Sequence, residues 1–121
     1  MNKNVLFFDT YAFFEILNGN PNYNIYREFF PITSIFNLAE LNYCLKKDFD
    51  ERTADKFTDA YAYCVVDVDI EDIKKAMNLK LKNKKMSIPD VIGYALARKL
   101  GIKFLTGDKE FKDIPEVEFV K

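Results

Sequence analysis

Apolar residues along this chain follow two spacings. In one group of segments they form short continuous runs, which predict buried strands. In the other group they recur every three to four positions, which predicts helices with one buried face. The predicted strands are residues 4–8, 31–33, 64–68, 102–105 and 117–120. The predicted helices are residues 10–17, 23–30, 34–47, 51–63, 70–79 and 88–100, the third beginning at Ser34 or Asn37.

The order of these elements predicts the fold class. Strands that alternate with helices pair in parallel through right-handed crossovers, so the pattern predicts an α/β fold, a three-layer sandwich with helices on both faces of a sheet. Turn residues 18–21 end the first helix, and Gly101 follows the last one at the position that favours glycine. No repeat, linker or low-complexity segment interrupts the pattern. We therefore expect residues 1–121 to form a single domain.

Composition changes this picture mainly through an absence, because the 121 residues include no histidine. Histidine general bases, Ser-His-Asp triads and His-ligated zinc are thereby excluded. Eighteen basic residues meet nineteen acidic ones, so any contact with nucleic acid must come from a local patch. Cys44 and Cys64 lack paired spacing and predict buried thiols in a reducing compartment. With no apolar run that could span a bilayer or serve as a signal peptide, we expect a cytoplasmic location and no membrane partner.

Four acidic residues occupy positions that a parallel sheet brings together. Asp9 and Asp108 each come just past a predicted strand, whereas Glu40 and Asp90 lie near the starts of predicted helices. In such sheets the carboxyl ends of strands and the amino ends of helices share one edge, where ligands bind. We therefore expect Asp9, Glu40, Asp90 and Asp108 to meet there, although they are far apart in sequence.

Grouping these carboxylates is electrostatically unfavourable. Two unit charges at 4 Å repel by about 4 kcal/mol at an effective dielectric constant near 20. Without a counter-ion, some carboxyl groups would hold protons with raised pKa values. A cation relieves the repulsion, and ligands that are all oxygen favour Mg²⁺ or Mn²⁺. Such an ion activates water and neutralises charge on a phosphate, so a phosphodiester can be hydrolysed without histidine.

Four segments are similar to the motifs of PIN-domain nucleases and come in the same order. They are residues 5–10 (VLFFDT), 37–41 (NLAEL), 87–95 (SIPDVIGYA) and 105–111 (LTGDKEF). The resemblance covers essentially the whole chain and implies a mostly parallel five-stranded sheet and Mg²⁺- or Mn²⁺-dependent cleavage of RNA. Chains this short look most like the toxins of VapBC toxin–antitoxin pairs, which implies an antitoxin partner and a homodimer.

The same resemblance assigns roles to individual residues. Asp9, Glu40, Asp90 and Asp108 would be the catalytic, metal-binding acids. Thr106 would be the hydroxyl that orients Asp108, Thr10 would support the site, and Glu110 would stand in for a further acid found in many relatives.

Each candidate also has a local structural alternative. Asp9 and Asp108 fit turn or helix-capping acids. Residues 37–40 and 87–90 both fit the capping-box pattern, which would use Glu40 and Asp90 to satisfy backbone N–H groups. The dipole of its helix would keep Asp90 ionised, and Gly93, on the same helix stripe, would leave room for substrate. Lys82, Lys84 and Lys85 would contact RNA phosphates, or would simply form a solvated connector.

Three other functions compete with the nuclease. A receiver-type phospho-switch would use Asp67 as phosphoacceptor, but that fold needs an acid pair after the first strand, and Asp9 stands between Phe8 and Thr10. A phosphatase with an aspartate nucleophile would need a general acid where the chain has Tyr11, which cannot readily do that work near neutral pH. A catalytically degenerate PIN-like binding module would lack some of the four acids, and all four are present.

Overall fold

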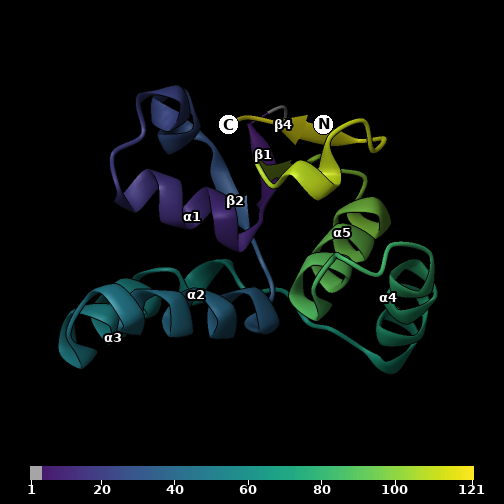
Figure 1. Ribbon diagram of the computed structural model, residues 1–121, viewed down its shortest axis with the longest axis horizontal. Coiled ribbons are helices and arrows are strands. Elements are labelled where there is room, and N and C mark those ends of the chain that lie inside the picture. The colour runs from purple at the N-terminus through teal and green to yellow at the C-terminus, as the bar shows by residue number, and fades with distance from the viewer. Residues whose placement is uncertain (1–3) are drawn as a thin grey trace.

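The computed structural model describes residues 4–121, in which four parallel strands form one sheet with helices on both faces (Figure 1). The first three residues of the expected domain lie outside the described residues. The strand order is β2-β1-β3-β4, and all three pairings are parallel. The strands are β1 (Val5–Phe8), β2 (Phe30–Ile32), β3 (Phe104–Thr106) and β4 (Val117–Phe119). The expected α/β class and the three-layer arrangement are confirmed.

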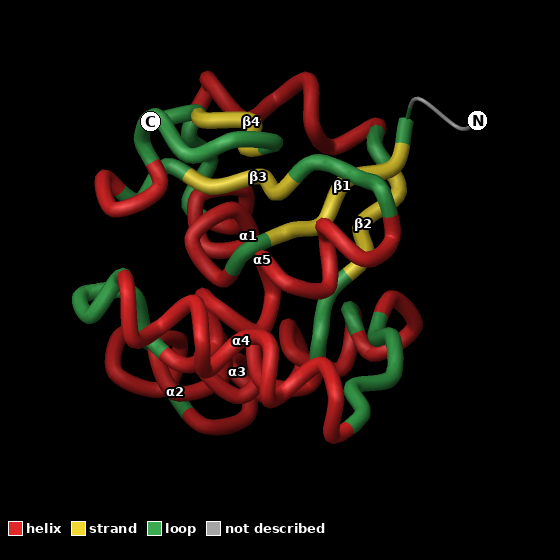
Figure 2. Tube along the Cα trace, turned by 90° about the vertical axis from the view of Figure 1, so that its right-hand side faces the viewer, coloured by secondary structure: helices red, strands yellow, loops and turns green. Residues whose placement is uncertain are grey.

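Helices surround the sheet on both faces and below it. The α-helices are α1 (Thr10–Leu17), α2 (Ile35–Asp48), α3 (Glu51–Ala60), α4 (Ile70–Lys82) and α5 (Ile88–Leu100). Three 3₁₀ segments are η1 (Pro21–Glu28), η2 (Ala62–Cys64) and η3 (Lys109–Phe111). In Figure 1, α1 lies on one side of β1 and β2, α4 and α5 lie on the other, and α2 and α3 lie below. Figure 2 shows the strands side by side in the upper half of the molecule, above α2 and α3. Among residues 4–121, no helix has the length and hydrophobicity required to cross a bilayer.

Alternate residues of β1 build two separate cores. Leu6 and Phe8 pack with residues of α1, η1 and α2 on one face, whereas Phe7 packs with residues of α5 on the other. The ring of Phe7 stacks on that of Phe104 in β3, with 5.7 Å between centroids. Because side chains of a strand point alternately to opposite faces, the continuous apolar run in β1 is what a strand covered on both sides requires. The two cores fix the position of the residue that follows, Asp9.

Gly93 allows α5 to lie close to the sheet. A Cβ atom at this position would come 2.8 Å from the Phe7 ring and 3.0 Å from the Phe104 ring, closer than ordinary van der Waals contact. The expectation that Gly93 leaves room for substrate is therefore wrong, because the small residue serves packing against β1 and β3. The same close approach carries the amino end of α5 toward the end of β1.

The prediction of a fifth strand at residues 64–68 is wrong for the described chain. This segment forms only a single bridge, between Thr33 and Val65. Its backbone hydrogen bonds run from Thr33 N to Cys64 O at 3.0 Å and from Val66 N to Thr33 O at 2.9 Å. The pairing stops there because Ser34 already caps α2, so the chain beyond β2 has no further extended backbone to pair.

Two predicted helices differ in kind or extent. Residues 23–30 were expected to be a helix, and the chain instead forms the 3₁₀ segment η1, which starts earlier because the side chain of Asn20 caps it and Pro21 is its first residue. The helix expected over residues 51–63 ends at Ala60, as α3.

Candidate active site

Asp9 is a buried carboxylate between β1 and α1. Its side chain is 2% exposed. One oxygen, Oδ1, accepts a hydrogen bond of 2.8 Å from the backbone N–H of Thr10 and so caps α1. The other, Oδ2, accepts a hydrogen bond of 2.8 Å from the hydroxyl of Thr106, the last residue of β3. The local capping role is therefore real, and it holds this carboxylate at the carboxyl edge of the sheet.

Three of the four expected acids converge at this edge. Asp9, Glu40 and Asp90 each offer a carboxylate oxygen, and these three atoms all lie within 4.8 Å of one another. Asp9 and Asp90 are buried and Glu40 is partly buried. The three residues come from β1's end, from α2 and from α5, so the parallel topology brings together what the sequence separates. The donor set is entirely carboxylate oxygen, which suits a hard divalent cation.

The capping alternatives turn out differently for Glu40 and Asp90. Ser34, not Asn37, caps α2, so Glu40 lies beyond the first turn and cannot act in a capping box. Asp90 does form a capping box with Ser87: its Oδ2 accepts from Ser87 N at 2.8 Å, and its own N–H donates to the Ser87 hydroxyl at 3.1 Å. Asp90 therefore serves the helix and faces the other acids at the same time.

Burial and mutual repulsion make two of these acids hard to ionise. The pKa of Asp9 is raised well above its usual value by burial, and further by the nearby Asp90 and Glu40, although hydrogen bonds from Thr106 and Thr10 oppose the rise. Burial, with the charges of Glu40 and Asp108, raises the pKa of Asp90 to about 6. The pKa of Asp90 therefore shifts in the direction opposite to the one expected from the helix dipole, although a value of about 6 still leaves this carboxyl mostly ionised near pH 7. A bound cation would reverse both shifts.

Asp108 lies beside the trio without joining it. It lines the same cleft and its charge raises the pKa of Asp90, but its carboxylate is not among the three oxygens that meet within 4.8 Å. Its Oδ1 accepts from Glu110 N at 3.0 Å and caps η3, as the turn-acid alternative predicts. Glu110, the expected further acid, contributes this backbone N–H and does not line the cleft.

Thr106 and Thr10 hold the site together through backbone and side-chain contacts. The Thr106 hydroxyl donates to Asp9 and accepts at 3.1 Å from the backbone N–H of Asp108. It thus orients the Asp108 backbone and couples that loop to Asp9. The Thr10 hydroxyl donates at 3.1 Å to the carbonyl oxygen of Asn37 and ties α1 to α2.

Asn37 is a residue of the site that sequence reasoning missed. Its side chain is fully buried, and its amide nitrogen donates at 3.5 Å to Asp9 Oδ1 and at 3.3 Å to the Pro89 carbonyl. Its amide oxygen accepts at 2.6 Å from the Ser34 hydroxyl. From sequence, Asn37 is only a candidate capping residue three positions before Glu40. No local pattern reveals that its side chain joins α2 to the end of β1 and to the start of α5.

The acids open into a cleft of about 510 Å³ between α1 and α2. Its lining residues are Asp9, Thr10, Tyr11, Phe14, Glu15, Glu40, Cys44, Lys47, Asp48, Lys85, Ser87, Asp90 and Asp108. Of the three lysines expected to contact RNA, only Lys85 lines this cleft; Lys84 lines a separate hollow beside α4. Lys47 is a second cleft lysine that sequence reasoning did not single out. Cys64 is buried as expected, whereas Cys44 is only partly buried, because it faces the cleft.

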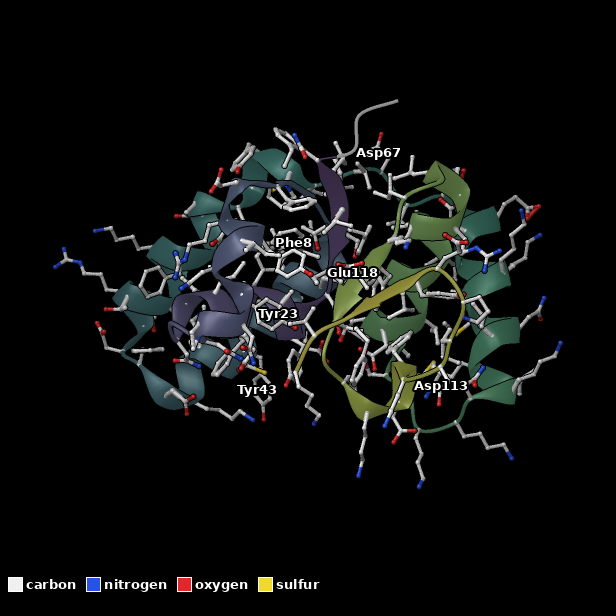
Figure 3. All side chains as sticks on the ribbon, turned by 90° about the horizontal axis from the view of Figure 1, so that it is seen from above. Phe8, Tyr23, Tyr43, Asp67, Asp113 and Glu118 are labelled. Carbon is white, nitrogen blue, oxygen red and sulfur yellow. The ribbon has the colours of Figure 1, made fainter. Side chains whose placement is uncertain are left out.

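Asp67, the phosphoacceptor of the competing receiver interpretation, is not part of this cleft. Figure 3 shows it at the upper edge of the molecule, away from the centrally placed Phe8 and Tyr23. The acid that a receiver domain would phosphorylate is therefore separated from the acids that would have to surround it.

Comparisons with known proteins agree with this architecture. The family model of the PIN domain matches residues 6–117. A chain of a toxin–antitoxin complex from Klebsiella pneumoniae is similar in structure, with a TM-score of 0.73 and 20% sequence identity over 93% of this chain and 94% of that one. A chain of VapBC2 from Rickettsia felis, bound to a DNA fragment from its promoter, has a TM-score of 0.70 and 17% identity over 96% and 97% of the two chains. No curated protein sequence matches significantly.

Proposed function

Because the chain belongs to the PIN-domain family of nucleases, we propose that it is an endoribonuclease that depends on Mg²⁺ or Mn²⁺ and hydrolyses RNA phosphodiester bonds. The observation that carries this proposal is the convergence of Asp9, Glu40 and Asp90 on one point, where burial and mutual repulsion raise the pKa values of Asp9 and Asp90. We assign residues 1–121 to a single nuclease domain.

The residues of the trio fit a divalent cation. Their oxygens come from three separate elements and no basic side chain pairs with them among the described residues. When bound, Mg²⁺ or Mn²⁺ would supply a Lewis acid that activates water and neutralises charge developing on a phosphate. The protein's part is to hold the ligands rigidly: Thr106 and Asn37 fix Asp9, and Ser87 fixes Asp90. Asp108 adds a fourth carboxylate beside them, available to bind a water or a further ion.

The cleft also supplies positive charge for a polyanion. Lys47 and Lys85 both line it, Lys47 from α2 and Lys85 from the connector before α5. RNA in the cleft must come close to the negatively charged acids, which repel its phosphates. Lysines act as positive point charges that neutralise phosphates and so offset this repulsion. We propose that both contact phosphates of the substrate, and that Lys82 and Lys84, outside the cleft, contact RNA farther from the scissile bond.

The neighbouring structures support a protein partner. Both are toxin–antitoxin assemblies. We propose that this chain is the toxin of such a pair, neutralised by an antitoxin protein. We further propose that it forms a homodimer and acts in the cytoplasm, where free thiols such as Cys44 and Cys64 stay reduced.

A cleavage assay with matched variants tests the proposal. Purified protein is incubated with single-stranded RNA and DNA oligonucleotides in Mg²⁺, in Mn²⁺ and in EDTA. We expect cleavage of RNA only, which EDTA abolishes. Glu40→Gln should remove activity, whereas Glu71→Gln should keep it, because Glu71 lies on α4, outside both the cleft and the trio. Cleavage that persists in EDTA, or equally in Glu40→Gln, would contradict the proposed function.

A further inference from the structure

The two walls of the cleft differ in chemistry. On α1, residues at helical spacing present two aromatic rings and an acid: Tyr11, Phe14 and Glu15. On α2, the facing residues are Glu40, Cys44 and Lys47. Residues three and four apart share one helix face, so each set forms a continuous wall that leads away from the acidic trio. Metal binding and the activation of water would explain the three acids. Neither hydrolysis nor metal binding requires aromatic rings, so the rings in this cleft need another explanation.

The Tyr11 ring is held rigidly beside the candidate catalytic loop. A Cβ atom at Gly107 would lie 2.5 Å from Cε1 of Tyr11, so the ring lies directly on the backbone between Thr106 and Asp108. Behind it, the fully buried ring of Tyr23 lies 6.3 Å away between centroids. Figure 3 shows Tyr23 near the centre of the molecule.

The wall opposite Tyr11 carries a cation that is available to a ligand. Lys47 forms no salt bridge within residues 4–121. Its ammonium lies 4.9 Å from the centroid of the exposed Tyr43 ring, which is its only described aromatic partner. The groove thus has aromatic rings on one wall, a lysine on the other, and the three acids at its end. A nucleotide carries a group that matches each of these: a flat base for the rings, a phosphate for the lysine, and the bond to be cut for the acids.

We propose that the groove between α1 and α2 is a nucleotide subsite, in which an unpaired base next to the scissile phosphate packs on Tyr11 and Phe14 while its own phosphate contacts Lys47. This inference rests on the proposed ribonuclease function and assigns particular residues to substrate binding at that site. Every base has a π-face, so stacking on aromatic side chains accepts many sequences. A base inside a duplex cannot offer that face, because its neighbours cover it. The subsite therefore needs an unpaired base at this nucleotide.

The test combines substrate and protein changes. A single-stranded RNA with one defined cleavage site is prepared with an abasic nucleotide at each position flanking that site, and as a duplex with its complement. For the unmodified protein, one abasic position should raise KM about ten-fold with little change in kcat. The duplex should be cut at least about ten-fold more slowly. Phe14→Leu and Tyr11→Leu should raise KM for the intact RNA by a similar factor, yet lose their sensitivity to the abasic position.

Matched variants separate the rings from general structural damage. Tyr11→Phe keeps the ring and should stay within about three-fold of the unmodified protein. Tyr63→Leu removes an exposed aromatic side chain from a different hollow and should leave KM unchanged. Thermal unfolding of each variant shows whether it is folded, and the abasic series on the unmodified protein needs no substitution at all.

Each other outcome overturns the inference in a distinguishable way. RNA cleavage that is equally fast at every abasic position, or on the duplex, would refute the subsite and leave the ribonuclease proposal standing. Failure of the unmodified protein to cut any RNA would instead refute the proposed function. If Phe14→Leu left KM for RNA unchanged but weakened capture of an antitoxin peptide, the groove would belong to the protein partner and not to the substrate.

Discussion

The starts of α4 and α5 are nearly identical in local structure and opposite in surroundings. Asp69 caps α4 and forms a capping box with Asp72, and Ser87 caps α5 and forms one with Asp90. In each, the third helical residue is an aspartate whose carboxylate accepts from the backbone N–H of the cap, at 3.0 Å and 2.8 Å respectively. Asp72 and Asp90 are each 7% exposed. Local geometry alone does not distinguish them.

Their electrostatic partners do distinguish them. Lys99 Nζ lies 3.1 Å from Asp72 Oδ1. The pKa of Asp72 is lowered first by the hydrogen bond from the Asp69 backbone and then by Lys99. Asp90 has Glu40 and Asp108 nearby instead, and burial raises its pKa to about 6. Helix capping and the ion pair with Lys99 are therefore enough to explain the role of Asp72. The same aspartate among other acids has no basic side chain beside it among the described residues, as expected for a ligand of the proposed metal centre.

The largest expected difference between the two aspartates is in activity. Asp90→Asn and Asp72→Asn each keep an oxygen to accept from the cap, so each helix start survives. Loss of a metal ligand should lower kcat by about a thousand-fold in Asp90→Asn, equivalent to several kcal/mol of transition-state stabilisation. Asp72→Asn should stay within about two-fold of the unmodified enzyme. Initial rates of RNA cleavage in saturating Mg²⁺ measure both, and similar losses in the two variants would erase the proposed distinction.

Metal binding should also distinguish Asp90 from Asp72 when no substrate is present. An ion that binds only the folded protein stabilises it by about 2.7 kcal/mol at one hundred times Kd, which for a chain of this size raises Tm by roughly 10 °C. We expect this rise with Mg²⁺ or Mn²⁺ in the unmodified protein and in Asp72→Asn. Asp90→Asn should show little of it. Calorimetry in EDTA and in a series of metal concentrations gives the answer, and an equal rise in all three proteins would argue against Asp90 as a ligand.

The convergence of Asp9, Glu40 and Asp90 could be predicted from sequence because it follows from topology. Once strands alternate with helices, parallel pairing brings strand ends and helix starts to one edge whatever the side-chain details. The capping of α5 by Ser87 was predictable for a different reason, since it depends on residues three apart. Both rules are insensitive to small errors in element boundaries.

The features that could not be predicted depend on contacts between distant segments. Asn37 reads as a capping residue until its side chain is found against Asp9 and Pro89. The expected strand at residues 64–68 has suitable apolar residues, but its pairing with Thr33 is limited by where α2 begins. The offset of Asp108 from the trio depends on its capping of η3. In each case the sequence specifies a residue type, and the tertiary structure decides its partner.

The pH dependence of stability should run in opposite directions for the two aspartates. Asp90 has a folded pKa of about 6 and an ordinary unfolded value near 4, so the folded state holds more protons between these values. Its contribution to stability is therefore present below about pH 4 and lost as pH rises through about 6, by about 2.7 kcal/mol for a shift of two pKa units. Burial raises the pKa of Asp9 too, so it contributes with the same sign. The pKa of Asp72 is lowered, so its contribution is present near neutral pH and is lost on acidification below about 4.

Urea unfolding in EDTA from pH 4.5 to 7.5 tests this prediction. Relative to the unmodified protein, Asp90→Asn should become progressively more stable as pH rises, because it lacks the carboxyl group that must ionise unfavourably. Asp72→Asn should be less stable than the unmodified protein by a nearly constant amount over the same range. Parallel curves for Asp90→Asn and the unmodified protein would contradict the raised pKa of Asp90.

The smallest effect is expected from removing the lysine that completes α4. Lys99→Met leaves Asp72 capping its helix but without a cation, so this helix start then resembles that of α5 in the absence of metal. The Lys99 side chain is 52% exposed, and water and salt screen such a pair, so the free energy of unfolding should fall only slightly. RNA cleavage should not change. Urea unfolding at pH 7 with and without added NaCl measures the loss, and salt should narrow the gap between the two proteins. A loss as large as that expected for Asp72→Asn, or one insensitive to salt, would mean that Asp72 also depends strongly on a cation. Burial without a counter-charge, and not the crowding of acids, would then be the feature that sets Asp90 apart.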